Sequence, residues 1–294
     1  MVKKDKGYQI FANIVMILLC VLAVLPFVLL FMSSVTDEQT LITDGYSFFP
    51  KKFSLYAYRY LFTRTSSVVR GYILSIIVTT IGTVLNLLIT VLYAYPLSRK
   101  QLPGRNFFAF YLFFTMLFSG GLVPSYLMWT QTFHIRNTIF ALLIPNLLMN
   151  AFNVIMMRTY FTANIPDAII EAAKVDGAGE FRILFGIVLP MALPILATIG
   201  LLVGLGYWND WMNGLYYIND DRMYSIQVLL MNIQKNLDSL RQQAQSGGNV
   251  SAANLPSTSV RMALTVMGIL PVMIIYPFTQ KYFVKGIAIG AVKG

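Results

Sequence analysis

Uncharged polar side chains that could bind a solute recur at helical spacing in two apolar stretches of the sequence. One set stands at i, i+4, i+8, i+11 and i+15 within residues 72–97: Ser75, Thr79, Thr83, Asn86 and Thr90. A second set stands at i, i+4 and i+7 within residues 138–157: Asn146, Asn150 and Asn153. Because an α-helix completes a turn in about 3.6 residues, each set is expected to lie on one helix face and to point inward.

These residue types suit a neutral, hydroxyl-rich solute. Amides and hydroxyls can donate to and accept from sugar hydroxyls, and aromatic rings such as Tyr93, Tyr95 and Trp208 offer a surface to a sugar ring. The alternative is that the polar groups bond to neighbouring helices, at about 0.6 kcal/mol each. Both interpretations stay open for the candidate path residues: Thr79, Thr83, Asn86, Asn146, Asn150, Asn153 and Trp208.

The sequence contains no group of residues suited to enzymatic chemistry. Its single cysteine, Cys20, cannot form an internal disulfide, and its single histidine, His134, cannot build an imidazole metal cluster. The phosphate-binding pattern GxxxxGK[ST] does not occur, and Gly200 and Gly204 lie inside an apolar stretch, which favours helix packing. We therefore expect no catalytic residue, no metal site and no cofactor bound by this chain.

The elements that carry these residues are long and apolar. Of 294 residues 57% are hydrophobic and 12% are charged, about half the usual charged share. Six stretches of at least 19 residues lack Asp, Glu, Lys and Arg: 8–32, 72–97, 107–128, 138–157, 187–209 and 262–280. At about 1.5 Å per residue, even the shortest nearly spans the hydrocarbon core of a bilayer. The sequence predicts an all-α membrane protein with six transmembrane helices, in a single domain over residues 1–294.

The distribution of charge predicts which side of the membrane each segment faces. Twelve of the 22 Lys and Arg residues fall in the 59 residues of the two termini and alternate connections, and ten fall in the other 100. The positive-inside rule then predicts that both termini and the segment 158–186 are cytoplasmic, and that 210–261 is a long outer loop. The net charge of +10 does not indicate nucleic-acid binding, because the charges lie between apolar stretches.

The cytoplasmic segment is predicted to fold as two short helices. Pro166 suits a helix start, Ala172 and Ala173 permit close approach of another surface, and Gly177 can adopt the positive φ that ends a helix. A second short apolar helix follows. The segment is therefore either a platform for a partner protein or an amphipathic helix that rests on lipid headgroups.

A family resemblance favours the partner protein. Glu171-Ala172-Ala173, three residues, Gly177, nine residues and Ile187-x-Leu189-Pro190 together resemble the EAA loop of permease subunits of ABC importers. In that family the loop forms the coupling helix, which sits in a cleft of the ATPase subunit. The resemblance implies the type I ABC importer permease fold and a role in ATPase coupling for eight residues: Glu171, Ala172, Ala173, Asp176, Gly177, Ile187, Leu189 and Pro190.

Two further stretches resemble a carbohydrate subfamily. The carboxy-terminal sequence PFTQKYFVKGIAIGAVKG is similar to that of the second permease of maltose-type importers, whose tail reaches between the ATPase subunits. GYWNDWMNGLYYI and LPSTSVRMA resemble Gram-positive permeases for oligosaccharides or polysaccharide fragments. The tail residues that would contact the ATPase are Lys285, Gly286, Gly290 and Gly294.

The resemblance implies a multi-pass subunit of the bacterial plasma (inner) membrane that is not itself an enzyme. Its implied partners are a second six-span permease, two copies of an ABC ATPase that bind ATP and magnesium, and an extracellular lipoprotein or periplasmic binding protein that delivers a carbohydrate. One alternative is an ABC importer permease for a peptide, an amino acid or an anion. Another is a homo-oligomeric channel or facilitator whose inner loop rests on lipid.

Overall fold

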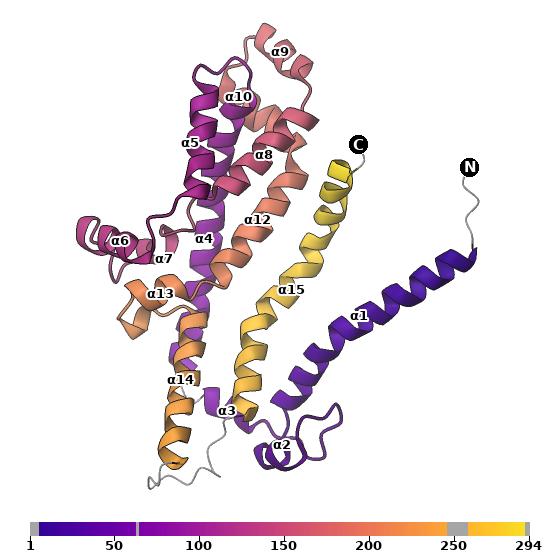
Figure 1. The fold of residues 1–294 in the computed structure, drawn as a ribbon, viewed down its shortest axis with the longest axis vertical. Helices are drawn as coiled ribbons and strands as arrows, with labels where there is room; N and C mark the ends of the chain where they lie inside the picture. Colours follow the sequence, from indigo (N-terminus) through magenta and orange to yellow (C-terminus); the bar gives the residue numbers. More distant parts are fainter. Residues whose placement is uncertain (1–5, 63–64, 246–257, 292–294) are drawn as a thin grey trace. The chain divides into compact units, whose positions relative to one another are not determined.

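The computed structural model of the chain describes residues 6–62, 65–245 and 258–291, which fold almost entirely into helices (Figure 1). An isolated antiparallel bridge joins Thr36 and Phe53. The helices in chain order are α1 (Lys6–Ser34), α2 (Glu38–Asp44), α3 (Tyr56–Phe62), α4 (Thr65–Ser98), α5 (Arg105–Leu117), α6 (Leu122–Leu127), η1 (Met128–Thr132), α7 (Ile139–Leu143), α8 (Ala151–Asn164), α9 (Asp167–Val175), α10 (Glu180–Ile183), η2 (Leu184–Val188), α11 (Leu189–Met191), α12 (Leu193–Trp208), α13 (Met212–Tyr217), η3 (Asp221–Met223), α14 (Ile226–Gln245) and α15 (Thr258–Ala291).

The described chain forms two compact units. Unit 1 consists of residues up to 68 together with 229–271, and unit 2 consists of residues 69–228 together with those from 272 onward. The candidate functional residues between 75 and 213 all belong to unit 2.

Unit 1 fixes the start of α15 through a partly buried carboxylate contact. Glu38 of α2 accepts hydrogen bonds from the backbone N–H groups of Thr258 (2.9 Å) and Ser259 (2.8 Å), and from the Ser259 hydroxyl (2.6 Å). The first N–H groups of a helix have no partner within the helix, and the helix N-terminus favours negative charge. Asp238 of α14 pairs with Arg261 of α15, which ties the two helices together.

Three helical stretches among the described residues are long and apolar enough to cross a membrane: Lys6–Ser34, Ser67–Ser98 and Thr258–Pro277. The expected spans 8–32 and 72–97 lie within α1 and α4, and 262–280 lies within α15. Two bent pairs of helices raise the number to five if each pair is counted as one span.

The expected third span, 107–128, is not one continuous helix. Helix α5 ends at Leu117, and the axes of Arg105–Leu117 and Leu122–Thr132 differ by 111°. Gly121 at the break has φ +82°, a conformation that glycine adopts without the steric cost of a side chain.

The expected fifth span, 187–209, is also bent. The axes of Glu180–Met191 and Leu193–Trp208 differ by 83°. Pro190 and Pro194 flank this break, and a proline ring has no backbone N–H to donate to the preceding helical turn. Helix α12 therefore starts only after the bend.

The expected fourth span, 138–157, is wrong as a continuous helix. Helix α7 ends at Leu143, residues 144–150 are not helical, and α8 then continues to Asn164. Asn146 lies in the break with φ +61°, Asn150 precedes α8, and Asn153 lies within α8. The three asparagines therefore do not share a helix face. Asparagine side chains bond to nearby backbone, which favours turns and caps over helix interiors.

Three side chains from other helices bond to the backbone at this break. The Tyr207 hydroxyl donates to the carbonyl of Leu143 (2.8 Å), and the Asn213 amide donates to that of Pro145 (3.0 Å). The Asn86 amide donates to the carbonyl of Leu147 (2.6 Å). Tyr207, Asn213 and Asn86 are all buried, so these carbonyls, which lack the regular helical partner, are satisfied inside the protein.

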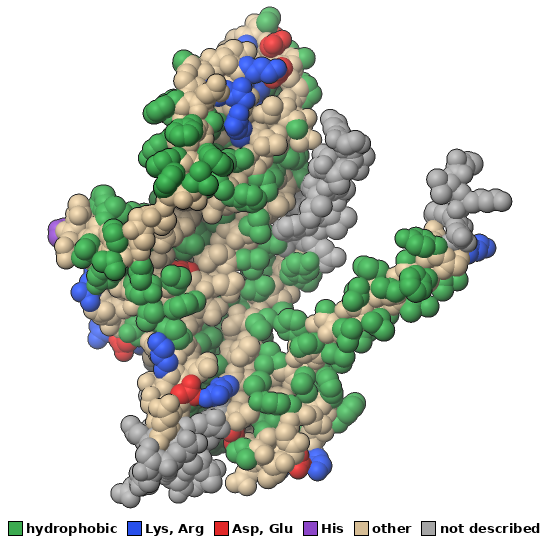
Figure 2. Space-filling model, viewed as in Figure 1, with side chains coloured by type: hydrophobic (Ala, Val, Ile, Leu, Met, Phe, Trp, Pro, Cys, Tyr) green, Lys and Arg blue, Asp and Glu red, His purple; other side chains and the backbone are tan. Residues whose placement is uncertain are grey.

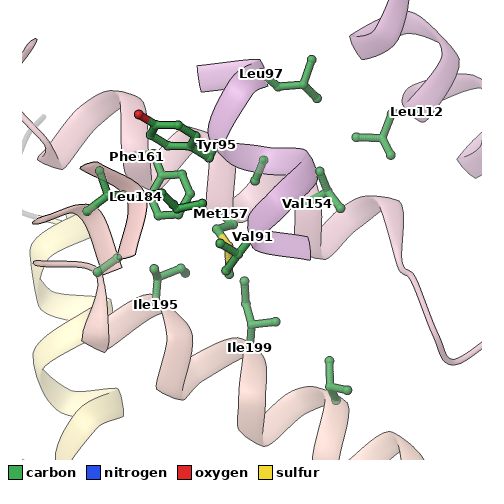
Figure 3. Close-up of a cluster of buried hydrophobic side chains, with 14 of the residues drawn as sticks. Val91, Tyr95, Leu97, Leu112, Val154, Met157, Phe161, Leu184, Ile195 and Ile199 are labelled. Atoms are coloured by element: carbon green, nitrogen blue, oxygen red, sulfur yellow. The ribbon is translucent and has the colours of Figure 1, made fainter. Parts of the chain in front are cut away.

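The core of unit 2 lies where α4, α8 and α12 meet (Figure 3). Val154, Met157 and Phe161 stand at i, i+3 and i+7 and form the buried face of α8. On α12, a Cβ atom added at Gly200 would lie 3.3 Å from Leu87 of α4, and one at Gly204 would lie 3.5 Å from the hydroxyl of Thr83. The helix-packing interpretation of these glycines is confirmed.

The carbonyl contacts at 143–147 predict that Asn86 and Asn213 stabilise the fold. Asn86→Leu or Asn213→Leu leaves a buried carbonyl without a donor, which costs about 1–3 kcal/mol. We expect both variants to unfold at a lower temperature in detergent. Asn236→Leu, at an exposed position of α14, is the control and should not change the midpoint. Normal stability with reduced transport in Asn86→Leu would instead favour a solute-path role.

Candidate functional site

The EAA segment forms a short helix that projects beyond the ends of α5 and α8 (Figure 1). Pro166 stands at the N-cap in an extended conformation (φ −62°, ψ 132°), and Asp167 lies in the first turn of α9. The proline has no N–H group that would need a partner, and the carboxylate suits the positive end of the helix. We call α9, the following turn and α10, residues 167–183, the platform.

Helix α9 ends in a glycine turn. Gly177 has φ +78°, its N–H donates to the carbonyl of Lys174 (3.0 Å), and the N–H of Ala178 donates to that of Ala173 (2.9 Å). This pair of bonds is the Schellman motif. Nothing lies within 4 Å of a Cβ built at Gly177, so the backbone conformation, and not lack of space, selects glycine. The prediction that Gly177 ends the helix at positive φ is confirmed.

The two faces of α9 differ in burial. Ile170 and Ala173 are buried in the hydrophobic core of unit 2, whereas Glu171 and Ala172 are exposed. Val175, also on the helix, is 87% exposed, which is unusual for an apolar side chain. The exposed residues of the EAA motif and its following turn, Asp176 and Gly177 included, therefore form a surface that this chain does not cover.

The amino end of α9 lies beside the end of α4. Asp167 Oδ1 is 3.5 Å from Arg99 Nη1, and Asp167 Oδ2 is 4.0 Å from Lys100 Nζ. The Lys100 side chain is well exposed, whereas only 11% of the Arg99 side chain is exposed. Ion pairs at a water-exposed surface contribute little, so Arg99 carries more of this contact than Lys100.

The carboxyl end of α9 reaches α4 through Glu180. Lys174 Nζ lies 2.7 Å from Glu180 Oε1, and the Tyr95 hydroxyl donates to Glu180 Oε2 over 2.6 Å. Figure 2 shows acidic and basic side chains side by side at this end of unit 2. From the sequence, Tyr95 was expected only to offer a surface to a sugar ring, and Arg99, Lys174 and Glu180 were not predicted as site residues. The pairing of Tyr95 with Glu180 spans 85 positions, so no local pattern indicates it.

Ile187, Leu189 and Pro190 connect the platform to α12. Ile187 lies in the π-helical turn η2, and Leu189 and Pro190 lie in α11, directly before the 83° bend. Ile187 and Leu189 pack against the core of unit 2, and Pro190 is exposed. The backbone thus runs from the platform into α12 by way of a helical elbow.

The predicted polar face of α4 is inward-facing, but most of it is already hydrogen-bonded. Ser75 accepts from the N–H of Ile226 (2.8 Å), and the Thr90 hydroxyl donates to Asn86 Oδ1 (3.2 Å). Together with the bond from Asn86 to Leu147, these contacts support the packing interpretation for the three residues. The buried hydroxyls of Thr79 and Thr83 have no hydrogen-bond partner among the described residues.

The remaining path candidates do not form one cluster. Asn146 and Asn150 are exposed and Asn153 is buried. Asn150 accepts from the N–H groups of Phe152 (2.9 Å) and Asn153 (3.4 Å), which makes it the N-cap of α8. Trp208 is buried, with its ring 6.2 Å from that of Tyr72.

The turn between α12 and α13 was not predicted from the sequence. Asp210 Oδ1 accepts from the N–H of Asn213 (3.3 Å), the residue that holds the carbonyl of Pro145. Burial raises the pKa of Asp210, although the N–H groups of Asn213 and Met212 act in the opposite direction. The Asp-x-x-Asn spacing is a local signal for this turn, but the carbonyl that Asn213 binds, that of Pro145, lies 68 positions away.

The four tail residues expected to contact the ATPase lie near or beyond the end of α15. Lys285, Gly286 and Gly290 belong to the backbone of α15, but their side-chain surroundings are not among the described features, and Gly294 lies outside the described residues.

With this geometry established, similarity to known proteins identifies the family. Residues 104–289 match the family described as "Binding-protein-dependent transport system inner membrane component", and the platform lies within them. The chain belongs to this permease family. It is 37% identical to the polygalacturonan/rhamnogalacturonan transport system permease protein of Bacillus subtilis, over 95% of this chain and 96% of the relative. An arabinooligosaccharides transport system permease protein of Halalkalibacterium halodurans is 27% identical over 93% and 92% of the two chains.

A solved structure shares the fold of this permease. It belongs to a bacterial ABC transporter involved in the import of the acidic polysaccharide alginate. The two chains are 30% identical, with a TM-score of 0.79 over 96% of this permease and 99% of that chain. The predicted ABC importer permease fold is confirmed. The family consists of multi-pass inner-membrane transport proteins, not enzymes, and its importers work with a partner permease, an ATPase and a binding protein.

The N-cap geometry predicts that Asn150 contributes to stability. Asn150→Leu removes the acceptor for two N–H groups of α8 and should cost about 1 kcal/mol, whereas Asn150→Asp keeps an acceptor there. We expect a lower thermal midpoint for the leucine variant and a near-normal one for the aspartate variant. Impaired transport in both variants at unchanged stability would return Asn150 to the solute path.

Proposed function

We propose that this permease is the transmembrane subunit of an ATP-driven ABC importer and forms, with a second six-span permease, the translocation path for a carbohydrate. The family match supports the importer, and the relatives named for polysaccharide and oligosaccharide transport support the class of solute. The solute is an oligosaccharide or polysaccharide fragment, delivered by an extracellular lipoprotein or periplasmic binding protein.

The observation that carries this proposal is the exposed face of α9. Glu171, Ala172 and Val175 are exposed beside a glycine turn, and the platform continues by its backbone into α12. A short helix with small and apolar side chains on its free face can enter a cleft of a partner. A force applied to such a helix is passed along the backbone to α12 through the elbow at residues 187–192.

In this proposal the platform and both termini lie in the cytoplasm, where two copies of an ABC ATPase dock against α9. ATP and magnesium bind to the ATPase, and this chain binds no cofactor and catalyses no reaction. Closure of the ATPase pair moves the platform and favours one of two access states of the path. The tail residues Lys285, Gly286, Gly290 and Gly294 contact the ATPase, and the outer segment 210–261 contacts the binding protein.

Reversing the charge on the exposed face of α9 tests the docking role. We expect Glu171→Lys to reduce ATPase retention on the tagged permease by tenfold or more, because Glu171 is exposed and makes no intramolecular salt bridge in the described structure. The complex is purified from its native membrane, co-eluting subunits are identified, and their ratios are measured by native mass. Insertion of the variant in the membrane is checked in parallel.

Asp221→Lys is the charge-matched control, because Asp221 is exposed and lies outside the platform. Its complex should keep the ATPase. ATP-driven uptake of galacturonan, alginate and arabinan oligosaccharides into proteoliposomes then identifies the solute. Normal ATPase retention in Glu171→Lys would contradict the docking role, and recovery of copies of this chain alone from the wild type would point to a channel or facilitator.

A further inference from the structure

The platform is joined to α4 as well as to α8 and α12, and this second connection is made by side chains. We propose that Tyr95, Arg99 and Glu180 are positioning residues that transmit movement of the platform to α4, so that α4 and α12 move together. The inference rests on the proposed function, because it assumes that an ATPase moves the platform. It assigns a role in coupling to three residues outside the EAA motif.

Glu180 is the centre of the connection at the carboxyl end of α9. One carboxylate oxygen pairs with Lys174 of α9 at 2.7 Å, and the other accepts the Tyr95 hydroxyl of α4 at 2.6 Å. A carboxylate that binds two elements through its two oxygens fixes their separation, and bonds to an ionised group are shorter and stronger than neutral ones. Glu180 thus links the last turn of α9 to α4.

Tyr95 is itself held firmly. It is 5% exposed, and its ring lies in the core near Phe161 of α8 and Leu184 of η2 (Figure 3). The Tyr95 hydroxyl lies at the edge of this core, where it donates to Glu180. A ring packed on several sides cannot follow Glu180 by turning about its own bonds, so displacement of Glu180 acts on the backbone of α4.

Arg99 makes the equivalent connection at the amino end of α9. Arg99 stands one turn after Tyr95, and its guanidinium carbon lies 4.9 Å from the centre of the Tyr95 ring. Its Nη1 atom lies 3.5 Å from Asp167 Oδ1. Its Nε and Nη2 atoms are buried without a hydrogen-bond partner among the described residues, so the ring and Asp167 are the contacts that hold it. Both ends of α9 are therefore attached to the same final turns of α4.

Apolar side chains do not fill the space between the platform and α4. The polar contacts are therefore the more direct link between the two elements. A hollow of about 390 Å³ lies between them, lined by Leu92, Leu102, Phe181 and Leu184 as well as by Tyr95 and Arg99. Where side chains do not fill the space, packing transmits displacement less directly than in a dense core. The hydrogen bond and the ion pairs bridge this gap.

Helix α4 has a reason to follow α12. The two helices touch through Gly200 and Gly204 of α12, and the ring of Tyr207 occupies the space that Gly82 of α4 leaves free. If the platform moved α12 alone, this close interface would have to slide. A second connection to α4 allows the pair, with Thr83 between them, to move as one body.

The test measures coupling in the reconstituted complete importer. Wild type, Tyr95→Phe, Glu180→Ala and the double variant are compared for saccharide imported per ATP hydrolysed. We expect each single variant to retain the ATPase but to import at least threefold less saccharide per ATP. The double variant should equal Glu180→Ala, because both changes break the same hydrogen bond. Arg136→Gln, which removes an exposed charge outside the platform and α4, is the control and should match wild type.

A conservative variant separates coupling from mere structure. Glu180→Gln keeps a side-chain oxygen that can accept from the Tyr95 hydroxyl but loses the ion pair with Lys174, so it should import at least half as much saccharide per ATP as wild type. This variant also tests the inference if Tyr95→Phe does not assemble. Unchanged yield per ATP in Glu180→Ala, or a yield in Glu180→Gln as low as that of Glu180→Ala, would overturn the inference. A wild-type complex that imports no saccharide with ATP would overturn the proposed function as well.

Discussion

The structure of this permease depends on the need to satisfy backbone polar groups where no water is available. In hydrocarbon, an unpaired N–H or carbonyl costs several kcal/mol, so a spanning chain is helical or has its irregular backbone bonded within the protein. The break at 143–147 follows the second principle, because its carbonyls are bonded by side chains of the protein. Tyr207, Asn213 and Asn86 bring donors from three helices to the carbonyls of Leu143, Pro145 and Leu147. The break in the helix is a fixed junction of α4, α7, α12 and α13.

The same constraint explains why polar side chains of α4 form hydrogen bonds within the protein. A membrane helix gains little from burying apolar surface against another helix, because lipid is equally apolar, so close packing and interhelical hydrogen bonds hold the pair. Ser75, Asn86 and Thr90 supply such bonds, and Gly200 and Gly204 bring α12 close enough to α4 for their side chains to interlock. Polar residues at helical spacing therefore mark the inward face of α4, whether or not a solute touches it.

Local features of the sequence predicted much of the fold and of the candidate site. Apolar length predicted α1, α4 and α15, and the glycine at 177 predicted the end of α9, because each depends only on residues that are neighbours in the chain. The breaks at 118–121 and 144–150 were missed, since hydropathy does not register where a helix bends. The pairing of Tyr95 with Glu180 was also missed. It is decided by how α4 and α10 pack, and no sequence period links positions 85 residues apart.

The permease combines two kinds of connection that respond differently to force. At the elbow before α12, two prolines leave the backbone with fewer hydrogen bonds, so bending there disrupts less than it would in an intact helix. At 144–150, by contrast, three buried side chains lock the irregular segment, so bending would break three hydrogen bonds at once. Movement that starts at the platform is therefore absorbed more readily at the elbow than at the break. The core formed by α4, α8 and α12 is then displaced with little internal change, as expected for a densely packed body joined at a compliant hinge.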